Sequence, residues 1–223
     1  MAELVFFTGP MDSGKSTLAL QVAYTETRAG RVGRLFTRGD RAGEATITSR
    51  IGLTSTAIEV HEDFDFWAYL VGELSSGHRV DFLVCDETQF YAVCHIDQLA
   101  RIADDLDIEV FCFGILSDFR TELFPASRRL VELCDRMEMA QVRPRCWCGA
   151  VATHNARIVD GLMVVEGDQV VVGDTGAPEA EVSYQVLCRR HHRQRLTARV
   201  AGVDATPDPL PFDDEPAGGP PDS

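Results

Sequence analysis

Short apolar runs alternate along the chain with longer segments in which apolar residues recur every three or four positions. Largely apolar runs of four to six residues are typical of strands in the interior of a sheet. They lie at 4–7, 80–85 and 109–114, and two further candidates lie at 34–37 and 57–60. We therefore predict strands at these five places.

The segments between these runs have helical periodicity. Helices are predicted from Lys15 to about residue 23, over 64–74, over 96–106 and around 130–134. Strands that alternate with helices predict right-handed βαβ units, and hence an α/β fold with a parallel sheet and helices on both faces. The polar, glycine-containing segment 38–50 is predicted to be a mobile loop.

The first strand leads into a phosphate-binding loop of the pattern G-x-x-x-x-G-K-[ST]. Its residues are Gly9, Pro10, Met11, Asp12, Ser13, Gly14, Lys15, Ser16 and Thr17. Two glycines let the backbone wrap with its N–H groups pointing at phosphate oxygens, and the following helix adds the positive end of its dipole. Lys15, the only lysine in the chain, can reach the β and γ phosphates, and the Ser16 hydroxyl can bind Mg²⁺.

The strand at 80–85 ends in an acidic pair, Asp86 and Glu87. Ligands of parallel sheets sit at the carboxyl ends of the strands, so this pair is expected beside the phosphate-binding loop. Asp86 can hold Mg²⁺ opposite Ser16. Glu87 is placed to act as a base on an attacking hydroxyl or water, which predicts phosphoryl transfer.

A second candidate site lies near the carboxyl end of the chain. Cys146 and Cys148 form a C-x-C pair on a predicted turn, and Cys188 begins a C-x-x-H pair at a predicted helix start. Three thiolates and one imidazole are a ligand set for a structural zinc ion, which would stabilise a small segment with little core of its own. The spacing favours His191 as the fourth ligand, with His192 as the alternative.

Changes in composition divide the chain into three predicted parts. Residues 1–142 form the nucleotide-binding α/β domain, and residues 143–200 form a zinc-binding domain with β-type runs at 156–159 and 170–173. Residues 201–223 are acidic and rich in Pro and Gly, which predicts a disordered tail.

The charge of the chain argues against a nucleic-acid-binding function. The net charge is −14, and the stretch from Asp204 to Ser223 accounts for six of the acidic residues, so the rest of the chain stays at −8. A nucleic-acid-binding protein needs a basic face for its affinity. No nucleic-acid partner is therefore expected.

The chain shows neither an apolar stretch of 18 residues nor a signal peptide at its start, so we expect no membrane partner and a cytoplasmic location. Seven cysteines in a reducing compartment do not suggest a disulfide framework. Four of them lie in apolar surroundings and are predicted to be small core residues: Cys85, Cys94, Cys112 and Cys134.

Taken together, residues 4–195 resemble the thymidine kinase family, in the type that carries a zinc-binding lasso domain on a P-loop (RecA-like) α/β domain. The resemblance rests on several motifs in the family's order. They are 9–17, Ser49-Arg50-Ile51-Gly52-Leu53, Cys85-Asp86-Glu87-Thr88-Gln89-Phe90, Gly114 through Phe124, Cys146-Trp147-Cys148-Gly149, and 184–191.

The resemblance implies transfer of the γ-phosphoryl group of ATP to the 5′-hydroxyl of thymidine, which gives thymidine monophosphate for DNA synthesis. The position of Glu87 is similar to that of the family's catalytic base, and the position of Gln89 is similar to one that lies beside the nucleotides. Lys15, Ser16 and Asp86 are similar to its phosphate and Mg²⁺ ligands, and Arg50 is a weaker candidate for steadying phosphates.

The resemblance also implies an acceptor site and an assembly. The positions similar to those that line the thymine pocket are Met11, Phe90, Ile115 and Phe119, with Val170, Val171 and Val172 in the lasso and Tyr184 closing over the site. The segment 174–183 is longer than in the family, which lengthens the lasso. Similar enzymes are homotetramers inhibited by thymidine triphosphate.

Two other functions are alternatives to a kinase. A P-loop ATPase with a structural zinc knuckle would use Glu87 to activate water, and it differs from a kinase only in lacking an acceptor pocket. A zinc module that binds nucleic acid is the second alternative, and the acidic balance of the chain disfavours it.

Overall fold

The computed structural model describes residues 1–38, 45–169 and 182–203. A six-stranded sheet with the order β5-β2-β6-β7-β1-β8 forms its centre, and all five pairs of neighbouring strands are parallel. The strands are β1 (Leu4–Thr8), β2 (Gly33–Thr37), β5 (Ile58–Glu59), β6 (Phe82–Cys85), β7 (Glu109–Gly114) and β8 (Arg136–Met139). The predicted parallel sheet is confirmed.

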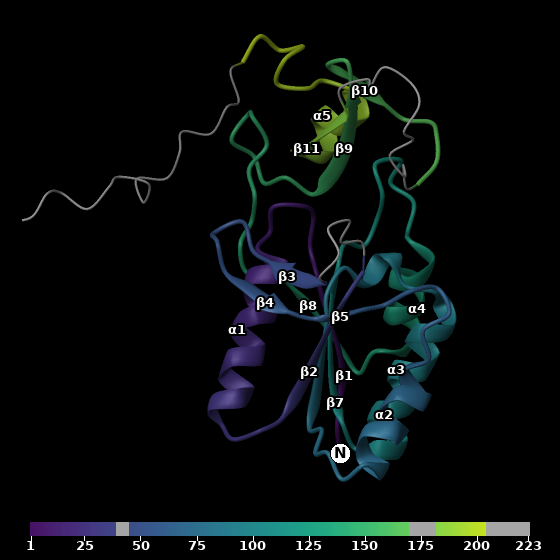
Figure 1. Ribbon diagram of the computed structural model, residues 1–223. Coiled ribbons are helices and arrows are strands. Elements are labelled where there is room, and N and C mark those ends of the chain that lie inside the picture. Colours follow the sequence, from purple (N-terminus) through teal and green to yellow (C-terminus); the bar gives the residue numbers. More distant parts are fainter. Residues whose placement is uncertain (39–44, 170–181, 204–223) are drawn as a thin grey trace, which may run out of the picture.

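Helices cover both faces of this sheet, as Figure 1 shows. The helices are α1 (Lys15–Arg28) on one face and α2 (Phe66–Ser75), α3 (Val93–Leu106) and α4 (Pro125–Leu133) on the other, with a short 3₁₀ helix η1 (Thr88–Phe90). In β1, Leu4 and Phe6 pack toward α2, α3 and α4, whereas Val5 and Phe7 pack toward α1. Because both faces are buried, every residue of β1 is buried, which explains its continuous apolar run.

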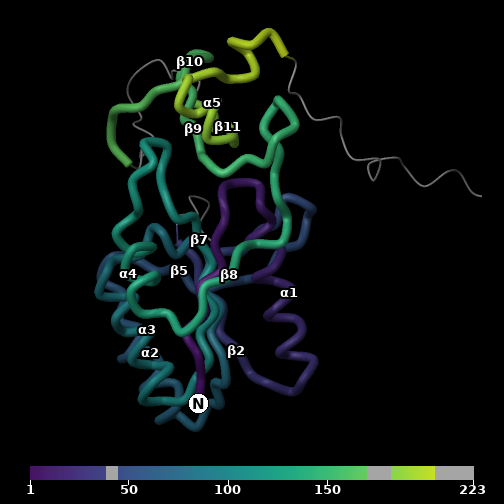
Figure 2. Tube along the Cα trace, turned by 180° about the vertical axis from the view of Figure 1, so that it is seen from behind, coloured from purple at the N-terminus to yellow at the C-terminus, as the bar shows by residue number. Residues whose placement is uncertain are grey.

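A smaller antiparallel sheet with the order β10-β9-β11 follows in the chain. Its strands are β9 (His154–Val159), β10 (Leu162–Val164) and β11 (Val182–Leu187), and the helix α5 (Arg189–Gln194) follows them in the chain. It has its own apolar cluster, in which Ala156 and Leu187 are fully buried. Figures 1 and 2 show this sheet beyond the carboxyl ends of the parallel strands, above the phosphate-binding loop.

The structure corrects two predictions. Part of the segment expected to be a loop, 38–50, is a strand, since β3 (Thr46–Thr48) pairs with β4 (Thr54–Thr56) in a hairpin. Cys94 is exposed and Cys134 is only partly buried, whereas Cys85 and Cys112 are in the core as predicted. Cys94 lies in the first turn of α3 on the side away from the buried Ile96 and Leu99.

Some predictions lie outside the described residues or are not tested. The β-type run at 170–173 and the acidic tail from 204 onward are outside them. The domain boundaries and the cytoplasmic location stay predictions. Within the described residues, no helix is both long and apolar enough to cross a membrane.

Candidate phosphoryl-transfer site

The phosphate-binding loop connects the carboxyl end of β1 to the first turn of α1. Gly14 has a φ of 76°, a left-handed conformation that favours glycine, and it immediately precedes the helix. A Cβ on Gly9 would lie 2.6 Å from the Ser13 Oγ. Both glycines are therefore needed for the tight wrap that turns backbone N–H groups toward the helix axis.

Lys15 lies across this loop. Its Nζ donates to the carbonyl of Pro10 at 2.8 Å, and it lies 3.3 Å from both the carbonyl of Gly9 and the Ser13 Oγ. Burial lowers the pKa of Lys15, while the carboxylates of Glu87 and Asp86 act in the opposite direction. An ammonium so placed can exchange its carbonyl partners for phosphate oxygens.

Asp86 ends the buried strand β6 and is 3% exposed. Burial, followed by the nearby charge of Glu87, raises its pKa to about 6, and a hydrogen bond from Ser16 acts in the opposite direction. The Ser16 contact brings together the two residues that were predicted to bind Mg²⁺. A buried carboxylate next to a hydroxyl is a ligand pair suited to a hard divalent cation.

Glu87 has a φ of 52°, so the chain turns sharply after β6 and η1 begins. Its carboxylate accepts a hydrogen bond from the Gln89 amide. The other end of that amide, Gln89 Oε1, accepts from the N–H of Ile115 at 3.1 Å, just beyond β7. Gln89 thus fixes Glu87 relative to the end of the neighbouring strand.

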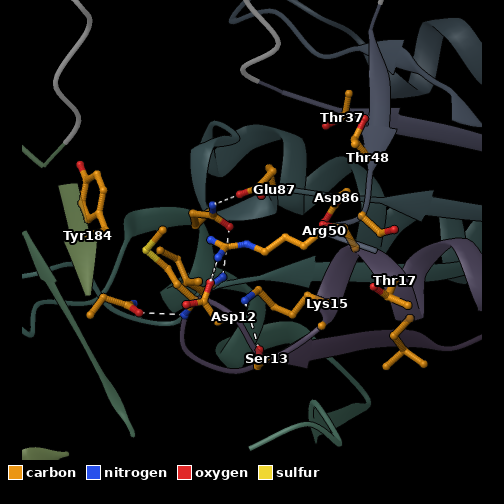
Figure 3. Close-up of a pocket in the computed structure, with 18 of the residues that line it drawn as sticks. Asp12, Ser13, Lys15, Thr17, Thr37, Thr48, Arg50, Asp86, Glu87 and Tyr184 are labelled. Carbon is orange, nitrogen blue, oxygen red and sulfur yellow. Dashed lines mark hydrogen bonds and ion pairs between the residues drawn. The ribbon is translucent and has the colours of Figure 1, made fainter. Parts of the chain in front are cut away.

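These residues line a cavity of about 920 Å³ between the phosphate-binding loop and the smaller sheet, shown in Figure 3. The predicted acceptor residues Met11, Phe90, Ile115, Phe119 and Tyr184 all line it, and so do Glu87 and Gln89. Of the predicted phosphate-binding residues, Gly9 and Pro10 do not line the cavity, whereas Asp12 to Thr17 and Asp86 do. Val170, Val171 and Val172 lie outside the described residues.

The cavity is also lined by polar residues that the sequence did not single out, among them Asp118, Asn155, Arg157 and Gln169. Asn155 and Arg157 are both on β9, and of the two only Arg157 lay in the predicted β-type run 156–159. Arg50, at the tip of the β3–β4 hairpin, forms an ion pair with Asp12 at 2.5 Å. The hairpin therefore contacts the phosphate-binding loop.

The predicted metal ligands Cys146, Cys148, Cys188 and His191 come together. Their ligand atoms all lie within 4.8 Å of one another, and this donor set can hold a metal ion such as zinc. Cys146 and Cys148 are on a turn closed by an N–H···O bond from Gly149, and Cys188 precedes α5. His192 is not in this cluster.

His192 points in a different direction from His191. Its buried Nε2 lies 3.0 Å from the carbonyl oxygen of Phe119 and 3.2 Å from that of Asn155. The two adjacent histidines therefore face different surroundings: His191 faces the cysteines and His192 faces the loop that carries Phe119.

The parallel sheet has this loop after β1 and an acidic pair after β6, and both face a partly aromatic cavity. These features are typical of a P-loop nucleotide-binding protein that carries out phosphoryl transfer. A family model described as thymidine kinase matches residues 2–192. The chain belongs to the thymidine kinase family.

Similar proteins match along nearly the whole chain. A thymidine kinase of Cutibacterium acnes is 59% identical over 213 residues, which are 96% of this chain and 98% of the relative. One of Streptomyces avermitilis is 59% identical over 212 residues, or 95% of this chain and 98% of the relative. One of Agrobacterium fabrum is 40% identical over 194 residues, or 86% and 96%.

The raised pKa of Asp86 predicts a pH-dependent stability. The pKa of Asp86 is about 6 in the folded protein against an ordinary value of 3.8. Between these two pH values the folded state therefore retains a proton that the unfolded chain releases. This stabilising contribution is complete below pH ~4 and is lost as the pH rises through ~6. Asp86→Asn lacks this loss, so its free energy of unfolding should rise relative to the wild type by roughly 2–3 kcal/mol between pH ~4 and ~7.

Urea unfolding without nucleotide or Mg²⁺ measures this difference. Asp63→Asn, at an exposed position, is the matched control and should show no such trend. A difference between Asp86→Asn and the wild type that stays constant over this pH range would contradict the prediction.

Proposed function

We propose that this protein is an ATP-dependent thymidine kinase, which transfers the γ-phosphoryl group of ATP to the 5′-hydroxyl of thymidine and gives thymidine monophosphate and ADP. The observation that carries the proposal is the single cavity that joins the phosphate-binding loop and the Asp86–Glu87 pair to the aromatic side chains of Phe119 and Tyr184. Membership of the family and the names of the relatives support the choice of acceptor.

The donor half of the cavity would neutralise and orient the phosphates. Backbone N–H groups of the loop and the ammonium of Lys15 bind their oxygens, while Ser16 and Asp86 would hold Mg²⁺. When bound, this ion would neutralise negative charge on the phosphates. Phosphoryl transfer requires mainly such positioning and little covalent work by the protein.

Glu87 would then act on the acceptor. Its carboxylate takes the proton of the 5′-hydroxyl as the bond from the 5′-oxygen to the γ-phosphorus forms, and the bond from this phosphorus to the β–γ bridging oxygen breaks. Gln89 holds the carboxylate in place through its hydrogen bond. The aromatic walls favour a nucleoside over water as the acceptor, which supports the kinase over the ATPase alternative.

We propose zinc as the ion of the cysteine–histidine cluster. Three sulfurs and one ring nitrogen suit tetrahedral zinc, and Trp147 covers the site by stacking on His191 with ring centroids 4.2 Å apart. The ion would fasten the turn at Cys146 to the start of α5. The role is structural because all four ligands come from the protein.

Three further proposals do not rest on the geometry of the site: the inhibitor and the assembly come from the family resemblance, and the location comes from the sequence. We propose thymidine triphosphate as a feedback inhibitor, since it carries both the base of the acceptor and a triphosphate. We propose a homotetramer as the assembly and the cytoplasm as the location.

The first expected outcome concerns the activity itself. Purified protein with ATP and Mg²⁺ should convert thymidine to thymidine monophosphate, and ADP should form in equal amount because one phosphoryl group passes to each acceptor. Chromatography of the products measures both. ADP formation that does not depend on thymidine, without any monophosphate, would establish the ATPase alternative.

Glu87→Gln should lower kcat by about 10²- to 10⁴-fold, since an amide cannot take the proton of the hydroxyl. ATP affinity, measured by calorimetry, should stay near that of the wild type. The control is Glu62→Gln at an exposed position, which should keep full activity. Turnover by Glu87→Gln at the wild-type rate would remove Glu87 as the base.

Metal analysis should find about one zinc ion per chain, because the cluster supplies the four ligands of one tetrahedral site. Cys148→Ser should lose the ion and unfold at a lower temperature, since metal binding contributes directly to folding. Cys94→Ser changes an exposed cysteine outside the cluster and should retain both zinc and stability. A protein that is folded and free of metal would refute the proposal.

A further inference from the structure

Two polar side chains of β9 lie in the wall of the cavity. Asn155 and Arg157 are two residues apart, so their side chains are on the same face of the strand. They are 5% and 3% exposed. Polar groups buried to this extent cost free energy unless they are hydrogen-bonded, so their partners show what they hold in place.

Asn155 connects the smaller sheet to the phosphate-binding loop. Its Oδ1 accepts the N–H of Met11 at 2.8 Å, and its Nδ2 donates to the carbonyl of Ser117 at 3.2 Å. Met11 lies within the turn between the two glycines of the loop, where the N–H groups must keep their directions to bind phosphates. Both ends of the Asn155 amide are thus engaged. Its Oδ1 fixes the phosphate-binding loop, and its Nδ2 is bonded to Ser117, two residues before Phe119.

Arg157 holds the opposite half of the cavity. Its Nε donates to the Tyr184 hydroxyl at 3.2 Å, and its two terminal nitrogens donate to the carbonyls of Asp168 at 2.8 Å and Gln169 at 2.9 Å. The guanidinium carbon lies 3.9 Å from the centre of the Phe119 ring. One side chain therefore contacts both aromatic walls of the acceptor pocket.

The three hydrogen-bond acceptors of Arg157, a hydroxyl and two backbone carbonyls, are neutral. A buried guanidinium without a carboxylate partner carries a large desolvation cost. Its planar fork, however, matches three acceptors in fixed directions, which neither lysine nor an apolar side chain can reproduce. The geometry therefore indicates positioning rather than stability as its role.

We propose that β9 positions the two halves of the cavity through different side chains, with Asn155 as the main positioning residue of the phosphate-binding loop and Arg157 as that of the acceptor walls. This inference rests on the proposed function for the identity of the acceptor. It goes beyond that function by assigning donor and acceptor binding to two different side chains of one strand.

The test is a pair of variants that serve as controls for each other. Asn155→Leu retains the approximate volume but cannot bind the Met11 N–H, and Arg157→Met retains the apolar stem but has no fork. We expect Asn155→Leu to raise the KM for ATP about tenfold and the KM for thymidine less than about threefold. Arg157→Met should show the reverse pattern.

Equilibrium binding by calorimetry accompanies the kinetics. If the wild type binds ATP but not thymidine, the proposed function fails, while the selective weakening of ATP binding in Asn155→Leu still tests the assignment of the donor half. Circular dichroism establishes that each variant is folded. Asn155→Ser and Arg157→Lys, which are smaller changes, provide the same comparison if either of the first pair unfolds.

Two results would overturn the proposal. One is an equal loss of both affinities in each variant, which indicates a general structural role of β9. The other is wild-type affinity for both substrates in folded variants, which indicates that neither side chain positions a substrate.

Discussion

The site depends on the burial of opposite charges at the carboxyl ends of the central strands. Asp86 is buried and Lys15 is partly buried, and burial raises the pKa of Asp86 and lowers that of Lys15. Each is partly compensated by the other and by polar groups of the loop. A polyphosphate with its cation brings further charges of both signs, so ligand binding satisfies groups that the protein alone satisfies only in part.

The parallel sheet sets up this arrangement. Its buried strands end together, so the loop after β1 and the acidic pair after β6 meet at one edge although more than sixty residues separate them in the chain. The smaller sheet lies above that edge and closes the cavity with Tyr184 and the contacts of β9. In the proposed function, donor chemistry therefore belongs to the first sheet and the acceptor walls are shared with the second.

The sequence predicted the parts of the site that depend on local backbone geometry. The loop from Gly9 to Thr17 is a strand–turn–helix unit, and the cysteine pairs are short turns, so their spacing alone indicates their chemistry. The contacts of β9 could not be predicted in this way. Met11 and Asn155 are 144 positions apart, and only the packing of one sheet above the other brings them together. Cys94 was misassigned because its apolar neighbours suggested burial, whereas its position on α3 faces outward.

In the proposed function, one cavity brings donor and acceptor together, so that the phosphoryl group passes between them in a single step. The stereochemistry of transfer from ATP made chiral at the γ-phosphorus tests this claim most directly. A single in-line displacement predicts inversion at phosphorus in the thymidine monophosphate. Retention would show two successive transfers through an intermediate on the protein, and would contradict the account.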